Sequence, residues 1–231
     1  VVAAELVLGR GVAGGGQLLE QLGGEREVAR HPAAFGLTGG DLPHGGTVAV
    51  ERILLDDDVP STCDLYTLGG GEDSAQLIAA ARLSASPGLQ AAAADGAPIF
   101  AVCAGLQVLG HTFRAHGNEV EGVGLLDVTT APLERRATGE LVSEPTRVGV
   151  TAELSQPLTG FENHMGATAL GPDASALGRV TRGVGNGGNE RVDGVVQGSV
   201  IATYMHGPAL ARNPQLADLL IARALDIPLA D

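Results

Sequence analysis

Two stretches of the chain repeat one order of residues, and that order constrains the fold more than any other feature. In residues 63–83, and again in residues 97–113, a short apolar run leads into small residues and then into a segment whose apolar positions have helical spacing. Strands that alternate with helices are joined by crossovers, which make neighbouring strands parallel. The sequence therefore predicts an α/β fold whose central sheet is covered by helices on both faces.

The N-terminal part is harder to interpret, because Gly, Pro and His are dense within it. Strands are expected at residues 5–9 and 47–55, with a short helix at 14–24 and a loop over most of 23–46. The three aspartates at 56–58 are expected to form a solvated turn rather than a metal site.

The second half of the chain has a different pattern from these two units. Short runs rich in β-branched residues are broken by Gly and Pro, and they predict strands and loops added to the sheet, at residues 122–130, 140–150, 157–168, 178–184 and 194–207. Helices are expected at 89–96 and at 213–226, the second with Asn213 as its N-cap and Pro214 at its first helical position.

Length and charge limit what the chain can do. With 231 residues, 44% of them hydrophobic, we expect a single domain over 1–231. A net charge of −13 argues against binding to nucleic acid or to an anionic membrane surface. All 14 basic residues are arginine, which excludes a Schiff-base lysine and a Walker-type phosphate loop within the chain. Any ATP chemistry would then need another chain or domain.

Cysteine usage and hydropathy indicate the compartment. The two cysteines, Cys63 and Cys103, each lie in or beside an apolar segment and form no CxxC pair, so neither a disulfide framework nor a zinc or other metal site is expected. No segment approaches the ~20 apolar residues of a membrane span, and the start of the chain has no basic region typical of a signal peptide. We therefore expect a cytoplasmic protein without membrane insertion.

The stretch around Cys103 has the layout of a nucleophile elbow. A buried-strand run at 98–102 precedes the cysteine, Ala104 and Gly105 are small, and a helix-like segment follows. In such a turn the helix N-terminus favours the thiolate, and the backbone N–H of Ala104 would face the oxyanion formed when sulfur attacks a carbonyl. The alternative, a buried structural cysteine, is equally compatible with this stretch alone.

Two further features favour the elbow. His206 follows a strand-like run, where the carboxyl ends of strands in an open α/β sheet bind ligands, so it could pair with Cys103. The turn at 68–73 carries three consecutive glycines and offers a second oxyanion donor, the backbone N–H of Gly71 or of Gly70. The same glycines would also suit an ordinary turn that enters a helix.

Together these pieces resemble class I, triad-type glutamine amidotransferases, and within them the cobyric-acid-synthase-like branch. The similarity is closest to the GatD family, the glutaminase subunits of lipid II isoglutaminyl synthases. It is carried by DLYTLGGGEDSAQ, PIFAVCAGLQVLG, GVGLLDVTT, TGELVSEP, LTGFENHMG and VVQGSVIATYMHGPALARNPQLADLLI. The resemblance implies a flavodoxin-like, three-layer α/β sandwich with a mostly parallel sheet and added antiparallel strands.

The resemblance also implies roles for individual residues. Cys103 is the expected nucleophile, His206 the general base, and Arg136 the residue that holds the carboxylate of L-glutamine, although the neighbouring Arg135 is an alternative. Glu162 and His164, in the GFENHMG stretch, could act near the site or belong to a structural loop. We expect packing for Cys63 and no chemical role for the histidines at 111 and 116.

The chain also departs from the pattern it resembles. Triad amidotransferases usually carry a glutamate two residues after the histidine, and here that residue is Pro208. The early loop of the subfamily is poorly reproduced in residues 9–46. The resemblance implies that a MurT-like ligase partner completes the triad with an aspartate and carries the ATP and magnesium, forming a heterodimer that amidates the D-glutamate α-carboxyl of lipid II in peptidoglycan synthesis. Corrinoid synthesis, or a non-catalytic subunit of the same fold, are the alternative functions.

Overall fold

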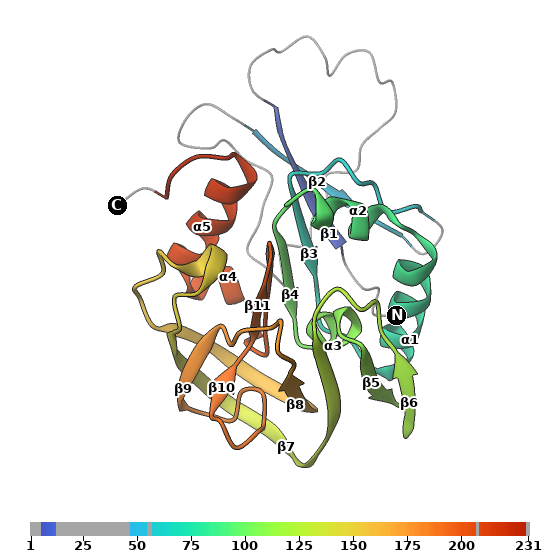
Figure 1. Cartoon of the computed structure of the whole chain (residues 1–231), viewed down its shortest axis with the longest axis vertical. Coiled ribbons are helices and arrows are strands. Elements are labelled where there is room, and N and C mark those ends of the chain that lie inside the picture. The colour runs from blue at the N-terminus through green and yellow to red at the C-terminus, as the bar shows by residue number, and fades with distance from the viewer. Residues whose placement is uncertain (1–5, 13–46, 55–56, 207, 230–231) are drawn as a thin grey trace.

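The computed structural model describes residues 6–12, 47–54, 57–206 and 208–229. The helix expected at 14–24 and the loop expected at 23–46 lie outside these residues. Where the chain is described, its elements form two sheets with helices packed around the first (Figure 1).

The first sheet contains the parallel strands that the sequence predicted. Its order is β11-β12-β4-β3-β1-β2, and its strands are β1 (Leu6–Val12), β2 (Thr47–Arg52), β3 (Leu65–Leu68), β4 (Ile99–Val102), β11 (Val195–Gln197) and β12 (Val200–Thr203). The central strands β3, β4 and β12 are parallel, and β1, β2 and β11 join them in antiparallel pairs. All residues of β3, β4 and β12 are buried, which is typical of strands covered on both faces.

Helices cover both sides of this sheet, so that the arrangement has three layers. Figure 1 shows α4 (Ala209–Arg212) and α5 (Pro214–Ala224) on one side, and α1 (Asp73–Ala85), α2 (Gly88–Ala94) and α3 (Ala104–Leu109) on the other. Glu72 stands at the N-cap of α1 and Asp73 in its first turn, where their charges suit the positive end of the helix dipole. None of the described helices is long and apolar enough to cross a bilayer.

The second sheet comes from the middle and late part of the chain. It is ordered β10-β9-β7-β5-β6, with β8 paired to β7, and consists of β5 (Thr112–Ala115), β6 (Asn118–Glu121), β7 (Val128–Pro145), β8 (Leu158–Leu170), β9 (Gly178–Arg182) and β10 (Val192–Asp193). The runs expected at 122–130 and 140–150 contribute to one strand, β7. Its pairing with β8 shifts register between Pro132 and Ala137, and a short 3-10 turn (Gly149–Thr151) follows it. Figure 1 shows β7 and β8 side by side below the first sheet.

The last helix begins where the sequence predicted, but Asn213 acts differently from the expectation. Pro214 occupies the first helical position, and Asn213 stands at the N-cap without a side-chain bond to the helix. Its Oδ1 accepts from the N–H of Thr159, and its Nδ2 donates to the carbonyls of Thr159 and Ala209. The side chain thus ties α4 and α5 to β8 instead of capping the helix.

Candidate active site

Cys103 lies in the turn that joins β4 to α3, in a backbone conformation that L-residues rarely adopt. Its φ is 54° and its ψ is −106°. Such strain costs about 1–3 kcal/mol and persists where surrounding contacts impose it. The N–H of Cys103 donates to the carbonyl of Thr203 over 2.8 Å, which fixes the turn against β12. A Cβ on Gly105 would lie 2.7 Å from the carbonyl oxygen of Leu68, so only glycine lets α3 approach β3 this closely. The expected elbow is present.

His206 lies just beyond the end of β12, on the same edge of the sheet as the cysteine. Its backbone N–H donates to the carbonyl of Phe161 over 2.7 Å, which links it to β8. A Cβ on Gly70 would lie 3.2 Å from Cε1 of His206 and 3.6 Å from Cβ of Cys103. The glycine turn after β3 therefore packs against both residues, and the structure brings the predicted nucleophile and base together.

The imidazole of His206 is suited to accept a proton. Burial, together with the charge of His164, lowers its pKa below the ordinary 6.5. The ring is therefore neutral at neutral pH. Its Nε2 is buried and has no hydrogen-bond partner among the described residues. Pro208, two residues further on, has no carboxylate that could orient the ring.

The pKa of the Cys103 thiol differs from the sequence expectation. Burial raises its pKa to about 11, and the backbone N–H of Ala104 and the charge of Arg136 lower it by less. The expected stabilisation of the thiolate by the helix N-terminus is thus outweighed by desolvation, because Cys103 is buried and α3 has only 6 residues. The resting group is a thiol, so its reactivity depends on a base such as His206.

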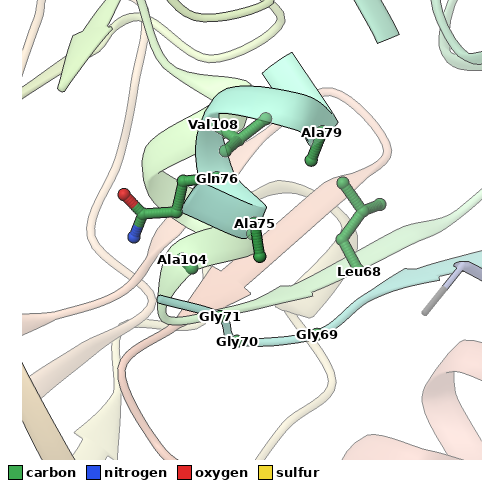
Figure 2. Close-up of a pocket in the computed structure, with 10 residues that line it drawn as sticks. Leu68, Gly69, Gly70, Gly71, Ala75, Gln76, Ala79, Ala104 and Val108 are labelled. Atoms are coloured by element: carbon green, nitrogen blue, oxygen red, sulfur yellow. The ribbon is translucent and has the colours of Figure 1, made fainter. Parts of the chain in front are cut away.

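The turn at 68–73 runs beneath this pair. Figure 2 shows Gly70 and Gly71 beside Ala104, where they line a small apolar cavity between β3, α1 and α3 with Leu68, Gly69, Ala75, Gln76, Ala79, Gly105 and Val108. Ala104 and Gly71 therefore line the same cavity. That their N–H groups form the oxyanion hole stays a prediction from the sequence.

A larger cleft of about 730 Å³ opens in front of Cys103. Cys103, His206, Gly71 and Arg136 line it together, and Arg135 is not among its lining residues. Both arginines belong to the stretch of β7 between Pro132 and Ala137, where its pairing with β8 is irregular. The guanidinium of Arg136 donates to the Oδ1 of Asn163 on β8 over 3.1 Å. The geometry thus favours Arg136 over Arg135 as the group that meets a ligand in the cleft.

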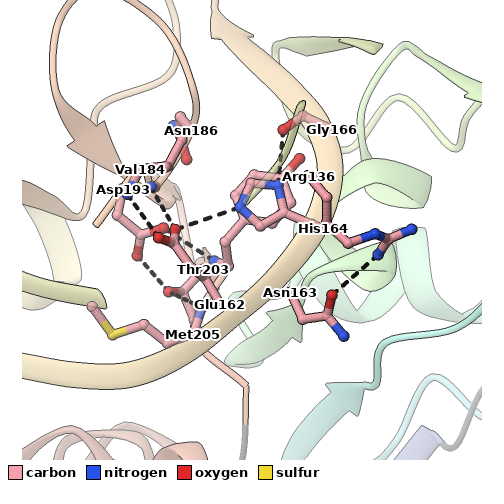
Figure 3. A network of polar contacts seen from close by, with 12 residues as sticks. Arg136, Glu162, Asn163, His164, Gly166, Val184, Asn186, Asp193, Thr203 and Met205 are labelled. Atoms are coloured by element: carbon pink, nitrogen blue, oxygen red, sulfur yellow. Dashed lines mark hydrogen bonds and ion pairs between the residues drawn. The ribbon is translucent and has the colours of Figure 1, made fainter. Parts of the chain in front are cut away.

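Glu162 and His164 belong to the buried face of β8 rather than to a loop, and His164 lines the cleft. Figure 3 shows them at the centre of a polar network. The carboxylate of Glu162 accepts from the N–H groups of Val184 and Gly185 over 2.8 and 2.9 Å, and lies 3.6 Å from Nε2 of His164. Burial raises the pKa of Glu162, but His164 and the two N–H groups lower it more, and it ends below its usual value.

The same network contains residues that sequence reasoning missed. The ring of His164 stacks on Tyr204, with centroids 3.8 Å apart. The hydroxyl of Tyr204 accepts from Nε2 of Gln107 and shares a hydrogen bond with Thr168. Asp193 is fully buried and accepts from the hydroxyl of Thr203 and from the N–H of Tyr204. Their signal was weak, because each is a single polar residue within a mostly apolar run.

The remaining side chains singled out in the sequence lie away from Cys103. His111 pairs with Asp127, and His116 contacts Asp73 and Ser74, both at exposed positions. Cys63 is buried, and its backbone N–H donates to the hydroxyl of Tyr66. Neither histidine nor Cys63 lines the cleft.

Comparison with known proteins places this geometry in a family. Residues 42–214 match the CobB/CobQ-like glutamine amidotransferase domain. GatD subunits of lipid II isoglutaminyl synthase (glutamine-hydrolyzing) are similar in two species. The Staphylococcus aureus protein is 36% identical over 71% of this chain and 65% of its own length, and the Streptococcus pneumoniae protein is 32% identical over 78% and 69%. The chain thus spans about two thirds of these relatives.

A cobyric acid synthase and a solved glutamine amidotransferase structure are also similar to this chain. A cobyric acid synthase of Pelotomaculum thermopropionicum is 32% identical over 68% of this chain and 32% of its own length. A solved glutamine amidotransferase structure superposes with a TM-score of 0.52 at 18% identity, over 70% of this chain and 79% of that one, which supports the fold alone. The fold and the family match confirm the resemblance seen in the sequence: the chain belongs to the CobB/CobQ-like glutamine amidotransferase family.

Proposed function

We propose that this chain is a glutaminase subunit, which hydrolyses L-glutamine through a cysteine thioester and passes ammonia to a MurT-like ligase. The observation that carries the proposal is the elbow: Cys103, in a strained conformation, lies beside His206 across Gly70, at the base of the cleft that Arg136 lines. The similarity to GatD subunits supports the same assignment.

The geometry suggests a role for each group in the formation of the thioester. The guanidinium of Arg136 binds the α-carboxylate of glutamine with two parallel hydrogen bonds. His206 takes the proton of the Cys103 thiol, and the sulfur attacks the side-chain carbonyl of glutamine. The N–H groups of Ala104 and Gly71 stabilise the oxyanion. When the tetrahedral intermediate collapses, the C–N bond breaks, His206 protonates the departing ammonia, and a thioester remains.

The second half of the cycle releases glutamate. His206, again neutral, takes a proton from water as that water attacks the thioester carbonyl. The C–S bond breaks, and the proton returns to the sulfur of Cys103. The thiol is thereby restored, which agrees with a pKa of about 11 for the resting group.

Among the described residues, the ring of His206 lacks a group that would orient it, which suggests that a partner subunit supplies one. No described carboxylate binds its ring, and a histidine base without such a group lacks a fixed tautomer. In the proposal, the ligase subunit supplies an aspartate, binds ATP and magnesium, and uses the ammonia to amidate the D-glutamate α-carboxyl of lipid II. Isolated chain would then hydrolyse glutamine weakly. The proposed compartment is the cytoplasm, where thiols stay reduced.

Co-purification with a neighbouring Mur-ligase-like protein, followed by an amidation assay, tests the proposal. The complex is expected to amidate lipid II when supplied with glutamine and ATP, and to release glutamate in equal amounts. A complex that amidates lipid II with ammonia but never with glutamine would identify a non-catalytic subunit. Activity only with corrinoid carboxylates would assign the chain to corrinoid synthesis instead.

A further inference from the structure

The pairing of β11 with β12 ends just before the segment that carries His206. Its last pair is Val195 with Ala202, and the same register would continue with Gly194 and then Asp193. Gly194 has a φ of 71°, and a Cβ there would lie 2.3 Å from the carbonyl oxygen of Ala202, so the chain turns away from the sheet at a position that only glycine suits. The backbone beyond β12 thus loses its partner strand on this side, and its N–H groups need other acceptors.

Two side chains supply those acceptors (Figure 3). Asp193 is fully buried, and it accepts from the N–H of Tyr204 with Oδ1 over 3.1 Å and from the hydroxyl of Thr203 with Oδ2 over 2.5 Å. The hydroxyl of Thr203 in turn accepts from the N–H of Met205 over 3.0 Å. Burial raises the pKa of Asp193 to about 6, so at neutral pH the carboxylate is mainly ionised and both oxygens accept. Three successive residues at the end of β12 are therefore held.

Thr203 also contacts the nucleophile. It pairs with Val102, the last residue of β4, and its carbonyl accepts from the N–H of Cys103 over 2.8 Å. That bond holds the turn in which Cys103 has its φ of 54°. Thr203 thus bonds to Cys103 through its carbonyl and, through its hydroxyl, to Met205, the residue that precedes His206.

We propose that Thr203, held by Asp193, is a positioning residue that fixes Cys103 and His206 relative to each other. The inference rests on the proposed function, in which His206 takes the proton of the Cys103 thiol. The N–H of His206 is bonded to the carbonyl of Phe161, so the segment between β12 and His206 is held at both ends. The hydroxyl of Thr203 determines how the chain runs between them, and a misplacement of about 1 Å can cost about 100-fold in rate.

A role in stability alone explains this arrangement less well. Moving a carboxylate out of water costs free energy, and hydrogen bonds from neutral groups offset only part of that cost. Tyr204 and Met205 are buried in any case, and a Cβ on Gly160 would lie 2.4 Å from Cβ of Met205, so the segment packs closely on β8 without a charge. The carboxylate lies instead where the backbone leaves the sheet to carry His206.

Two substitutions of Thr203 separate its hydrogen bonds from its packing. Thr203→Val removes the hydroxyl at nearly constant volume, and Thr203→Ser keeps it. The full chain is treated with iodoacetamide, and labelling of Cys103 and Cys63 is followed by peptide mass spectrometry. In Thr203→Val, Cys103 is expected to react at least about 10-fold more slowly than in the wild-type protein, because His206 no longer assists the loss of the thiol proton. Thr203→Ser is expected to react at nearly the wild-type rate.

A fold that is merely destabilised gives the opposite result, since opening exposes both thiols and speeds the labelling of Cys103 and Cys63 together. Thr151→Val is the matched control, because Thr151 is also buried and its hydroxyl donates to the carbonyl of Val148, outside the lining of the cleft. It is expected to lower stability without slowing the reaction of Cys103.

Glutamine kinetics of the complex give a second measurement. In Thr203→Val, kcat is expected to fall while KM stays unchanged, because Arg136 on β7 is not disturbed. A fall in kcat that Thr203→Ser shows equally would overturn the proposal. If labelling of Cys103 slows as expected but the wild-type complex never hydrolyses glutamine, the positioning holds and the proposed function fails. If the complex hydrolyses glutamine and Thr203→Val matches it in kcat, the proposed function holds and the positioning fails.

A measurement on the wild-type chain keeps the proposal testable even if Thr203→Val does not fold. In backbone amide hydrogen exchange, the N–H of Met205 is expected to be protected as strongly as those of β12. A Met205 amide that exchanges freely would overturn the proposal, because the hydroxyl of Thr203 would then not hold this segment. Labelling of Cys103 in folded Thr203→Val that equals or exceeds the wild-type rate would overturn it as well.

Discussion

The two sides of the cleft are built in different ways. The nucleophile side consists of β3, β4 and α3, where short strands of wholly buried residues end in glycine-rich turns. The opposite side consists of β7 and β8, long antiparallel strands that alternate between buried and exposed residues. On the first side, the backbone positions the reacting group through close packing. On the second, polar side chains, among them Arg136 and His164, line the cleft.

This contrast teaches which kind of substitution each side tolerates. Next to Cys103, contacts are made by backbone atoms and glycines, so an added methyl group is the damaging change. On β8, Glu162 and His164 are surrounded by polar partners, so a lost charge is the damaging change.

The largest effect is expected for Cys103→Ala. Loss of the nucleophile should reduce glutamine-dependent amidation by the complex by at least about 10³-fold, because no other group can form the thioester. Amidation with added ammonia should remain. Loss of both activities, with an intact circular dichroism spectrum, would show that Cys103 supports the partner's reaction rather than the hydrolysis of glutamine.

On the nucleophile side, two glycine substitutions should distinguish a change in the position of the His206 ring from a change in the stability of the fold. In Gly70→Ala, the new Cβ lies 3.2 Å from Cε1 of His206 and displaces the ring, so glutaminase activity should fall by about 10- to 100-fold with little change in stability. In Gly105→Ala, the new Cβ lies 2.7 Å from backbone of β3, so the free energy of unfolding should fall by about 1–3 kcal/mol.

Gly188→Ala is the control for both, since nothing lies within 4 Å of its Cβ position. It should change neither property. Full activity in Gly70→Ala would mean that the turn does not constrain His206, and equal stability of Gly105→Ala and wild type would mean that α3 can move away from β3. Chemical denaturation and a coupled glutamate assay provide the two measurements.

On the opposite side of the cleft, adjacent arginines should behave differently. Arg136→Ala should raise the KM for glutamine by roughly 10- to 100-fold, because a bond between charged partners contributes about 1.5–3 kcal/mol. Arg135→Ala should leave KM unchanged, since Arg135 does not line the cleft. Steady-state kinetics of both variants give the two KM values. An unchanged KM in Arg136→Ala would show that Arg136 does not bind the substrate.

The smallest effect is expected for Asp193, and it concerns the dependence of stability on pH. Burial raises the pKa of Asp193 from 3.8 to about 6 in the folded chain. The folded state then binds more protons than the unfolded state between these values, so this group contributes stability at low pH that is lost as pH rises through about 6.

In Asp193→Asn that loss should disappear. Between pH 4.5 and pH 7, the wild-type free energy of unfolding should fall relative to that of the variant by on the order of 2 kcal/mol. Denaturant titrations at the two pH values give the difference. Parallel pH profiles for the two proteins would show that Asp193 is ionised throughout this range, and would contradict the assigned burial effect.

Sequence reasoning succeeded where one strong pattern governs the structure. The apolar runs of β3 and β4, the glycine turn, and the placement of Cys103 and His206 at strand ends could all be predicted, because buried parallel strands need such runs and tight turns need small residues. The choice between Arg135 and Arg136 could not be made, since it depends on which face of β7 meets the cleft.

The remaining features of the site could not be predicted from the sequence, because tertiary contacts determine them. The alternation of β8 is visible in the sequence, but a period-2 pattern predicts an apolar inner face, and Glu162 and His164 occupy that face instead. Burial of the sulfur, which reverses the expected effect of the helix on the Cys103 thiol, depends on neighbours distant in sequence. The role of Asp193 likewise depends on Thr203 and Tyr204, to which it is joined only by folding.

The central claim is that Cys103 is a glutamine-directed nucleophile, and one labelling experiment tests it most directly. The chain, alone and with its ligase partner, is treated with the glutamine analogue 6-diazo-5-oxo-norleucine and mapped by peptide mass spectrometry. The account predicts one adduct on Cys103, faster with the partner present, prevented by excess glutamine and absent from Cys63. An unlabelled Cys103 in the presence of the partner, or equal labelling of Cys63, would contradict it.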